Sequence, residues 1–241
     1  MVCLLAYGET MKQKLLIVAM GMVISHLAIA DDSQGQCSLA SSVVNKVQSE
    51  LAVVVAQTNG GIFSPNRMWS AVVDRSGVLC SVIKIGDAWP GSRAIAIAKA
   101  STANDFSNDR LALSTANLYA ATQPGGSLYG LNNSNPFNPE FLPQGSGIGS
   151  VPGGIITFGG GVALYNSSGK VIGGLGLSGD SACADHTIAY RMRRLAGLDS
   201  IPGGVGFNHT DNILYAEPPG TTPTGFQHPH CFPTDIPPGS I

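Results

Sequence analysis

Three side chains that can take part in chemistry lie together at the start of a predicted helix. Cys183, Asp185 and His186 follow the turn at Gly179 and Asp180, in the stretch SGDSACADH. A thiol and an imidazole can ligate a metal ion, and the unpaired amides at a helix N-terminus attract negatively charged groups. The sequence therefore predicts a small-molecule site at this helix start.

The residues after this turn repeat with the period of an α-helix. One face of the predicted helix carries the apolar side chains Ala184, Ile188, Met192 and Leu195. The opposite face carries Cys183, His186, Tyr190 and Arg193. We expect the apolar face to pack on a sheet, which leaves His186 available to solvent, a partner subunit or a ligand. An exposed histidine without a function is the alternative. Asp180 or Ser181 can cap the helix, and Gly197 can end it.

Two known motifs lie close to this segment, but their context is wrong. Residues 174–179 match the G-x-G-x-x-G pattern of dinucleotide-binding proteins. Asp199, the acidic residue that would bind the ribose, follows a helix instead of a second parallel strand, so the βαβ unit is missing. A serine hydrolase needs G-x-S-x-G, and Asp180 stands where the second glycine belongs.

The cysteines and histidines could also form a metal site. It would use residues from two parts of the chain: Cys183, His186, His228, His230 and Cys231. Zinc is disfavoured because the last residues predict a tail and both cysteines can form disulfides instead. No pair of carboxylates is indicated for general acid–base catalysis, since helix capping and interaction with the helix dipole account for the positions of Asp180 and Asp185. The sequence contains no complete catalytic constellation.

Residues 1–30 have the pattern of a secretory signal peptide. A second methionine, Met11, opens a basic and then apolar run, which ends in Ala28-Ile29-Ala30 with cleavage expected before Asp31. The apolar run is short for a membrane span. We therefore expect an exported protein, secreted or periplasmic, with no membrane span after cleavage.

Composition and charge exclude some classes of partner. The formal net charge is −2, with 13 Lys and Arg against 15 Asp and Glu, and no basic patch invites nucleic acid. Only 12% of the residues are charged, which fits burial of surface by self-association. We expect a homo-oligomer.

Four cysteines remain after the leader: Cys37, Cys80, Cys183 and Cys231. An even number in an oxidising compartment predicts disulfides. Sequence alone does not choose among the three possible pairings. Cys37 and Cys231 lie near the two ends of the mature chain and could be joined, which would leave Cys80 with Cys183.

The rest of the chain divides into a predicted domain, residues 38–200, and a Pro/Gly-rich C-terminal tail, residues 201–241. Apolar periodicity predicts helices at residues 38–57 and 109–122, whereas residues 93–104 fit a helix or a strand. Residues 123–152 predict a long ordered loop. Five strands are predicted, the first two joined by a four-residue turn: 68–73, 78–85, 155–158, 162–165 and 171–177.

Five segments occur along this chain in the order MWSAVVDRSGVLCSV, WPGSRAIAIAKASTANDFS, LALSTANLYAATQPGGSLYGLNNSNP, FGGGVALYNSSGKVIGGLGLSGDSACADH and IAYRMRRLAGL. Taken together they resemble the GlcG/HbpS-like haem-binding family, over roughly residues 60–198. The resemblance implies an α/β fold of profilin-like type, with a five-stranded antiparallel sheet flanked by helices, and frequent assembly into oligomers. It also favours the helix for residues 93–104.

Members of that family are described as extracellular or periplasmic haem binders, some linked to haem breakdown or redox sensing. The resemblance thus makes haem the expected cofactor, which needs an axial donor for its iron and cations for its propionates. Three donors and three cations are chosen on chemistry and predicted position: His186, Tyr119, Tyr129, Arg93, Lys99 and Arg193. The predicted function is haem binding, in sequestration, sensing or breakdown. The alternative is an interaction or small-ligand-binding module of the same fold, with an enzyme acting on a small molecule as the third reading.

Overall fold

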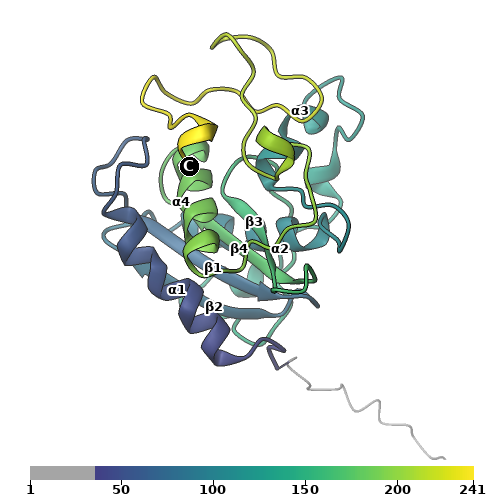
Figure 1. Ribbon diagram of the computed structural model, residues 1–241. Helices are drawn as coiled ribbons and strands as arrows, with labels where there is room; N and C mark the ends of the chain where they lie inside the picture. Colours follow the sequence, from purple (N-terminus) through teal and green to yellow (C-terminus); the bar gives the residue numbers. More distant parts are fainter. Residues whose placement is uncertain (1–35) are drawn as a thin grey trace, which may run out of the picture. The chain divides into compact units, whose positions relative to one another are not determined.

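A computed structural model describes residues 36–241, and the predicted signal peptide lies outside the described residues. The described chain folds around a four-stranded antiparallel sheet with the strand order β2-β1-β4-β3. The strands are β1 (Met68–Asp74), β2 (Leu79–Ile85), β3 (Gly161–Tyr165) and β4 (Val171–Ser178) (Figure 1).

Three long helices cover the two faces of the sheet: α1 (Ser41–Val55), α2 (Ser92–Asp105) and α4 (Ala182–Leu195). α1 and α4 pack on one face, and α2 packs on the other (Figure 1). Because both faces are covered, every residue of the central strand β1 is buried. The connections carry short helical turns, namely η1 (Thr115–Leu118), α3 (Tyr119–Thr122), η2 (Leu131–Asn133), η3 (Pro139–Phe141), η4 (Phe207–His209) and η5 (Pro238–Ser240).

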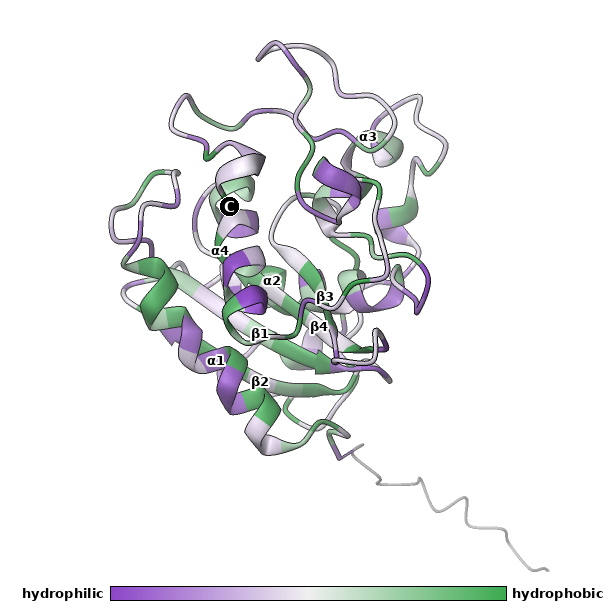
Figure 2. Ribbon diagram, viewed as in Figure 1, coloured by the Kyte–Doolittle hydropathy of each residue, from purple (hydrophilic) through white to green (hydrophobic). Residues whose placement is uncertain are grey.

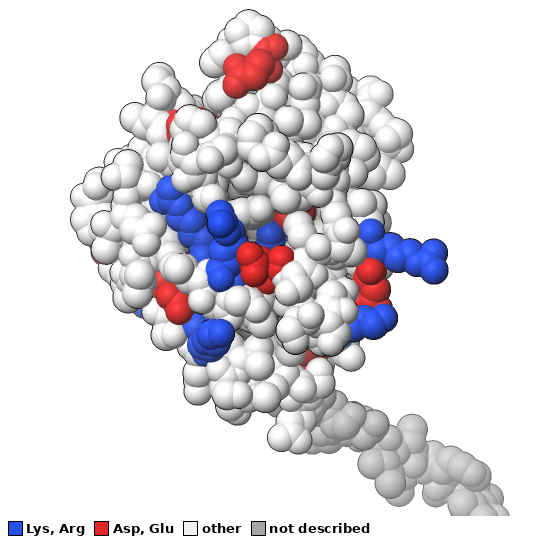
Figure 3. Space-filling view, in the orientation of Figure 1, with Lys and Arg blue, Asp and Glu red and all other residues white. Residues whose placement is uncertain are grey.

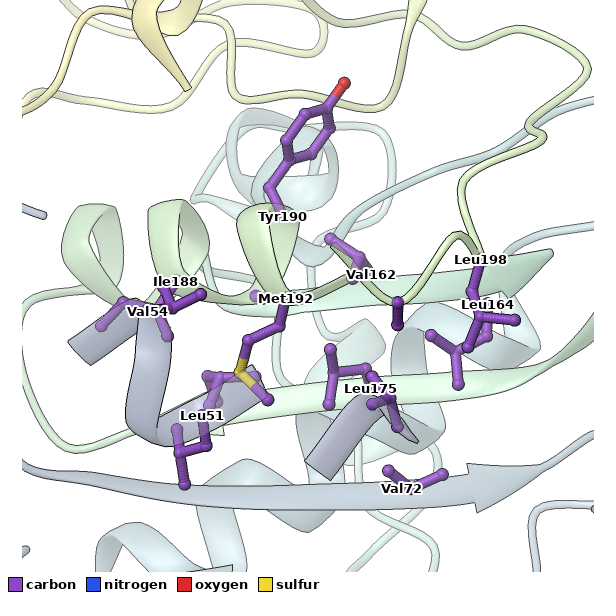
Figure 4. Packing of buried hydrophobic residues seen from close by; sticks show 14 of the residues in the cluster. Leu51, Val54, Val72, Val162, Leu164, Leu175, Ile188, Tyr190, Met192 and Leu198 are labelled. Atoms are coloured by element: carbon purple, nitrogen blue, oxygen red, sulfur yellow. The ribbon is translucent and has the colours of Figure 1, made fainter. Parts of the chain in front are cut away.

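The main apolar core lies between the sheet and the helix pair α1 and α4. Figure 4 shows side chains from both helices and from the strands meeting in one layer: Leu51, Val54, Val72, Leu175, Ile188 and Met192. Figure 2 shows the same division, since apolar residues fill the strands and alternate with polar ones along α1. Each such side chain contributes about 1.5–3 kcal/mol by burial, so this layer fixes the position of α4.

The glycines of the G-x-G-x-x-G stretch allow α2 to lie directly on β4. A Cβ atom at Gly174 would collide with the carbonyl oxygen of Ala100, and one at Gly176 would collide with that of Ala96. Only glycine permits so close an approach of helix and strand backbones. This packing explains the glycine spacing without a nucleotide.

Several predicted elements are confirmed with small shifts at their ends. The hairpin of β1 and β2 turns at Gly77, whose φ of +82° suits glycine. The helix predicted at residues 38–57 is α1, the one favoured at 93–104 is α2, and β3 and β4 lie where expected.

The prediction of five strands is wrong for the described chain, which has four. Residues 155–158 pair with no neighbouring strand. The amide of Ile156 donates instead to Oγ1 of Thr102 at 2.9 Å, and just after this segment the amide of Gly159 donates to Nε2 of His228 at 3.2 Å. The profilin-like description stays a prediction.

The single helix predicted at residues 109–122 is also wrong. An antiparallel bridge joins Asn108 to Leu111, and only then do η1 and α3 begin. Ser114 and Asn117 form a capping box that starts η1. The cap therefore sets the helix start six residues later, at Thr115, than the apolar spacing suggested.

Residues 201–241 run over α4 and end beside it (Figure 1). We call them the C-terminal cover. Two parallel bridges, Ala112 to Gly204 and Tyr215 to His228, help to order this segment in spite of its proline content. Within residues 36–241 no helix combines the length and the apolar composition needed to cross a bilayer.

The disulfides join Cys37 to Cys80 and Cys183 to Cys231. The pairing of Cys37 with Cys231 that the sequence suggested is therefore wrong. Each of these two cysteines bonds instead to a residue of a regular element, Cys37 to Cys80 on β2 and Cys231 to Cys183 on α4. The first disulfide fixes the approach to α1 against β2, and the second fixes the C-terminal cover to the start of α4.

Candidate functional site

α4 carries the residues from which the predicted site was built, and its ends are as expected. Oγ of Ser181 accepts a hydrogen bond from the amide of Ala184 at 3.2 Å, which caps the first turn. Gly197, with φ of +64°, follows the last turn. Ile188 and Met192 are fully buried against the sheet, whereas Leu195 on the same predicted stripe is 50% exposed.

His186 is fully buried, so the expectation that it is open to solvent is wrong. It does face away from the sheet, but the C-terminal cover lies over it. Its Nε2 accepts a hydrogen bond from the amide of Ile213 at 2.9 Å and lies 3.1 Å from Oδ1 of Asn212. Burial lowers the pKa of His186 to about 4, so the ring is neutral. Periodicity within the helix could not reveal a cover that comes from a distant part of the chain.

Arg193 and Asp211 form a buried, bidentate ion pair that also fixes the cover. Both guanidinium nitrogens donate to the carboxylate at 2.6 Å, and Nη1 donates to the carbonyl of Ala163 at 3.1 Å. Both side chains are completely buried. Arg193, predicted to bind a propionate, is thus already neutralised within the fold.

Lys99 is also buried and paired with a carboxylate, that of Asp185 on α4. Its Nζ lies 2.7 Å from Oδ2 of Asp185, donates to the carbonyl of Leu177 at 3.0 Å and stands 4.7 Å from the ring centroid of Phe158. Burial lowers the pKa of Lys99 and raises that of Asp185 to about 6. The pair joins α2 to α4 and leaves this cation without free access to a ligand.

Two further predicted residues, Arg93 on α2 and Tyr129, are associated with the long loop of residues 123–152. Arg93 is buried, and its guanidinium donates to the carbonyl of Phe141 at 2.6 Å and to that of Ser146. This cation therefore holds the loop in place. Tyr129 lies on the loop itself and is 69% exposed. Within the described residues, neither Arg93 nor Tyr129 contacts His186.

A cavity of about 690 Å³ opens between two segments, residues 119–127 and residues 220–230. We call it the loop cavity. Its volume lies within the usual range of small-molecule sites. Tyr119 and His230 line it, one from each segment. Of the six predicted cofactor-binding residues, Tyr119 alone lines it within the described chain.

His230 is held in a defined orientation beside this cavity. Its ring stacks on Tyr215 with centroids 4.2 Å apart. Its Nε2 lies 2.9 Å from Oε1 of Glu217, and its Nδ1 lies 3.6 Å from Oδ2 of Asp235. Glu217 is 63% exposed, while Asp235 is 2% exposed and so is the fixed partner.

Next to the cavity, the ring of Tyr119 packs on that of His228 with centroids 4.8 Å apart. His228 is buried, and burial lowers its pKa to about 4. It belongs to a compact group with Cys183 and Cys231, whose ligand atoms lie within 4.8 Å of one another. Three of the five residues weighed for a metal site therefore do come together, with both cysteines in the disulfide.

The fold and this arrangement can be set beside known proteins. The family model described as "Haem degrading protein HbpS-like" matches residues 46–193 of this chain. The chain belongs to the HbpS-like family. The resemblance to this family is thus confirmed, and the match includes all but the last two residues of α4 and stops before the C-terminal cover.

One curated relative of this HbpS-like protein is the corrinoid adenosyltransferase PduO of Citrobacter freundii, which is 35% identical over 121 residues. The aligned part covers 49% of this chain but only 29% of that enzyme, so the chain spans less than a third of its length.

Among solved structures, the PduOC:heme complex has a TM-score of 0.50 and 28% identity, covering 68% of this chain and 98% of that one. The Klebsiella pneumoniae protein ORFY has a TM-score of 0.51 and 23% identity, covering 66% and 90% of the two chains, and shows the fold alone.

The loop cavity of this HbpS-like protein lies partly outside the matched segment. Its second wall, residues 220–230, belongs to the C-terminal cover. The sequence did hold a signal for this wall, since His228-Pro229-His230-Cys231 concentrates three potential ligands in four residues. The proline content of the same segment, however, predicts a tail and not the wall of a cavity. His230 is therefore a cavity-lining histidine that was not among the six predicted cofactor-binding residues.

Proposed function

We propose that this HbpS-like protein binds haem in the loop cavity. The observation that carries the proposal is a pair of possible iron donors, an imidazole and a phenol, on the two walls of one cavity of about 690 Å³. The description of the family and the heme complex of PduOC, a relative in fold and sequence, support the choice of haem. Imidazole and phenolate are both established axial ligands of haem iron.

His230 is the proposed axial ligand. Histidine ligands usually donate their second ring N–H to a carboxylate, which fixes their orientation. Asp235 is placed for that role because its buried carboxylate faces Nδ1. Nε2 would then bind iron after leaving Glu217, and an exposed ion pair of this kind contributes little to stability. Stacking on Tyr215 keeps the ring in place.

Tyr119 is the second proposed donor, on the wall opposite His230. Among the described residues no Lys or Arg lines the loop cavity, so the three predicted cations do not serve the propionates there. Hydroxyl groups would bind them instead: Ser127, Thr221, Thr222 and Thr224. His186, the donor favoured by the sequence, could reach a ligand only if residues 211–213 moved away.

Export and self-association complete the proposal. The two disulfides support an oxidising compartment, secreted or periplasmic, since such bonds are rare in the reducing cytosol. The low charge supports a homo-oligomer. On the face shown in Figure 3 charged side chains are few, and basic groups lie beside acidic ones. Haem binding would serve sequestration, sensing or breakdown of haem.

A hemin titration followed at the Soret band tests the haem site. We expect the parent to bind, and His230→Ala to weaken binding by about tenfold or more, because outer-shell and ligand changes at metal sites have effects of this size. His209→Ala is the matched control, since His209 is exposed and lies outside the cavity lining. His186→Ala should bind as the parent does. Loss of binding in His186→Ala with normal binding in His230→Ala would contradict the site.

A further inference from the structure

The two disulfides among residues 36–241 differ in the charged and polar groups that surround them. Around Cys37–Cys80, one carboxylate oxygen of Asp74 lies near both sulfurs, with the three atoms within 4.8 Å of one another. Two carbonyl oxygens lie near as well, that of Leu39 at 3.8 Å from Sγ of Cys37 and that of Val78 at 3.4 Å from Sγ of Cys80. Negative charge and carbonyl oxygens disfavour a thiolate here.

Around Cys183–Cys231, one carbonyl oxygen, that of Pro229, lies 3.7 Å from Sγ of Cys183, but two N–H groups face the sulfurs as well. Cys183 is the second residue of α4, and its amide donates to Sγ of Cys231 at 3.2 Å. Nδ1 of His228 lies 4.0 Å from Sγ of Cys183. Because Nε2 of His228 accepts from the amide of Gly159, Nδ1 carries the ring proton, which it shares with the carbonyl of Pro229 at 2.7 Å. A helix N-terminus and an N–H donor both stabilise a thiolate.

The two sulfurs of this disulfide also differ in access. Cys183 is 1% exposed, whereas Cys231 is partly exposed and lines a separate cavity of about 400 Å³. Phe232, Pro233 and Asp235 form part of the same lining. An incoming thiol therefore reaches Cys231 first and leaves Cys183 as the departing sulfur.

We propose that Cys183–Cys231 is a thiol–disulfide exchange site that accepts electrons from an external dithiol. A thiolate of the dithiol attacks Sγ of Cys231, which forms a mixed disulfide and breaks the bond to Cys183. Cys183 departs as a thiolate at the start of α4, close to the N–H of His228. The second thiol of the reagent then attacks its own sulfur in the mixed disulfide and releases Cys231. Two electrons pass to the protein, and the dithiol leaves as its disulfide.

Exchange at this site would act on the loop cavity, a consequence that rests on the haem function proposed above. Cys231 directly follows His230, and the disulfide joins this part of the cavity wall to α4. With the bond open, Arg193–Asp211 still holds one end of the cover, but residues 220–231 lose their covalent anchor. The proposed ligand would then be less well placed, and hemin affinity would fall.

The exchange site is tested without haem. Folded parent protein is exposed to low dithiothreitol, quenched with iodoacetamide and analysed by peptide mass spectrometry. We expect Cys183 and Cys231 to be alkylated about tenfold faster or more than Cys37 and Cys80, since exchange follows leaving-group stability and access. With glutathione in place of the dithiol, the trapped adduct should sit on Cys231. Equal rates for the two bonds, or an adduct on Cys183, would overturn the proposal.

Two variants separate electrostatics from simple exposure. His228→Phe keeps a ring against Tyr119 but removes the N–H, and should slow opening of Cys183–Cys231 several-fold; His228→Gln, which restores an N–H donor, should recover part of the rate. Asp74→Asn removes the charge beside the other bond and should speed opening of Cys37–Cys80 alone. A rate for Cys183–Cys231 that is unchanged in both His228 variants would contradict the assigned donor.

The link to haem has its own readout. Protein in which only Cys183–Cys231 has been reduced and alkylated is titrated with hemin beside the disulfide-bonded parent, and we expect weaker binding by about tenfold. An unchanged affinity for hemin would overturn the link between disulfide exchange and haem binding, but it would not affect the conclusion from the exchange rates. A parent that binds no hemin would overturn the proposed function, again independently of those rates.

Discussion

The two faces of α4 are buried by different kinds of contact. The inner face, with Ile188 and Met192, packs on the sheet through apolar contacts that tolerate small shifts. The outer face, with His186 and Arg193, is equally buried but polar, and each group has a specific partner in the C-terminal cover. Figure 4 shows the division, since Tyr190 points away from the apolar layer. The comparison teaches that burial on the inner face follows from local pattern, whereas burial on the outer face depends on distant residues.

The largest effect should come from breaking the outer face at its ion pair. Asp211→Ala leaves the fully buried guanidinium of Arg193 without a partner charge, so we expect a loss of about 3–5 kcal/mol in the free energy of unfolding, measured by urea denaturation. Lys170→Ala is the control, because it breaks an exposed pair with Asp109 and should leave the urea midpoint unchanged. Replacing both partners, as Arg193→Met with Asp211→Leu, should recover much of the loss. Similar midpoints for Asp211→Ala and the parent would remove the distinction between the faces.

The inner face should respond to lost volume. Met192→Ala removes a fully buried side chain from the layer between α4 and the sheet, and we expect a loss of about 3 kcal/mol by cavity formation. Leu195→Ala changes a half-exposed residue of the same predicted stripe and should be far milder. The same urea assay measures both. Equal losses would show that the whole stripe, and not its buried part, stabilises the contact.

A third effect sharpens the comparison through pH. The pKa of His186 is about 4 in the folded protein, below its ordinary value of 6.5, so the unfolded chain binds more protons between these values. Stability from this group is therefore present above pH 6.5 and is lost as the pH falls towards 4, by up to about 3 kcal/mol. Asp185, whose pKa is raised to about 6, has the opposite sign: its contribution is present below pH 3.8 and is lost as the pH rises through 6.

His186→Gln isolates the histidine term, since Asp185 is unchanged and the amide oxygen can still accept from Ile213. Unfolding free energies at pH 7 and pH 4.5 should differ less in this variant than in the parent. An identical pH dependence would mean that His186 is accessible to protons in the folded state.

The smallest expected effect is shared by both faces. Ser181→Ala removes the hydrogen bond to the amide of Ala184 and should cost about 1 kcal/mol, because one N-terminal amide of α4 loses its partner. Ser181→Thr keeps the hydroxyl and should restore most of the stability. A loss as large as that of Asp211→Ala would show that the cap also positions the C-terminal cover.

Sequence reasoning succeeded where neighbouring residues decide the outcome. The bounds of α4 follow from Ser181 and Gly197, and the hairpin follows from a turn between two apolar runs. It failed for residues 155–158, whose apolar run suggested a strand, because the amide of Ile156 donates to the side chain of Thr102 and not to a neighbouring strand. No local pattern could have shown that partner.

The candidate site was predictable only in part for the same reason. His186 was correctly placed on the side of α4 away from the sheet, but its burial depends on Ile213. Lys99 and Arg193 carry the right charge, yet each is neutralised by a carboxylate that lies far away along the chain. The cysteine pairing needs the same long-range information, since the separations of 43 and 48 residues do not distinguish the bonds. A segment rich in proline can therefore be ordered when long-range bonds fix it.

The covalent attachment of the C-terminal cover has a consequence for limited proteolysis. Phe226, 44% exposed, offers chymotrypsin a cleavage site between Asp211 and Cys231. The fragment 227–241 produced by such a cut would stay attached to α4 through the disulfide between Cys231 and Cys183. The nicked protein would therefore migrate as one species on a non-reducing gel and separate into two only after thiol treatment.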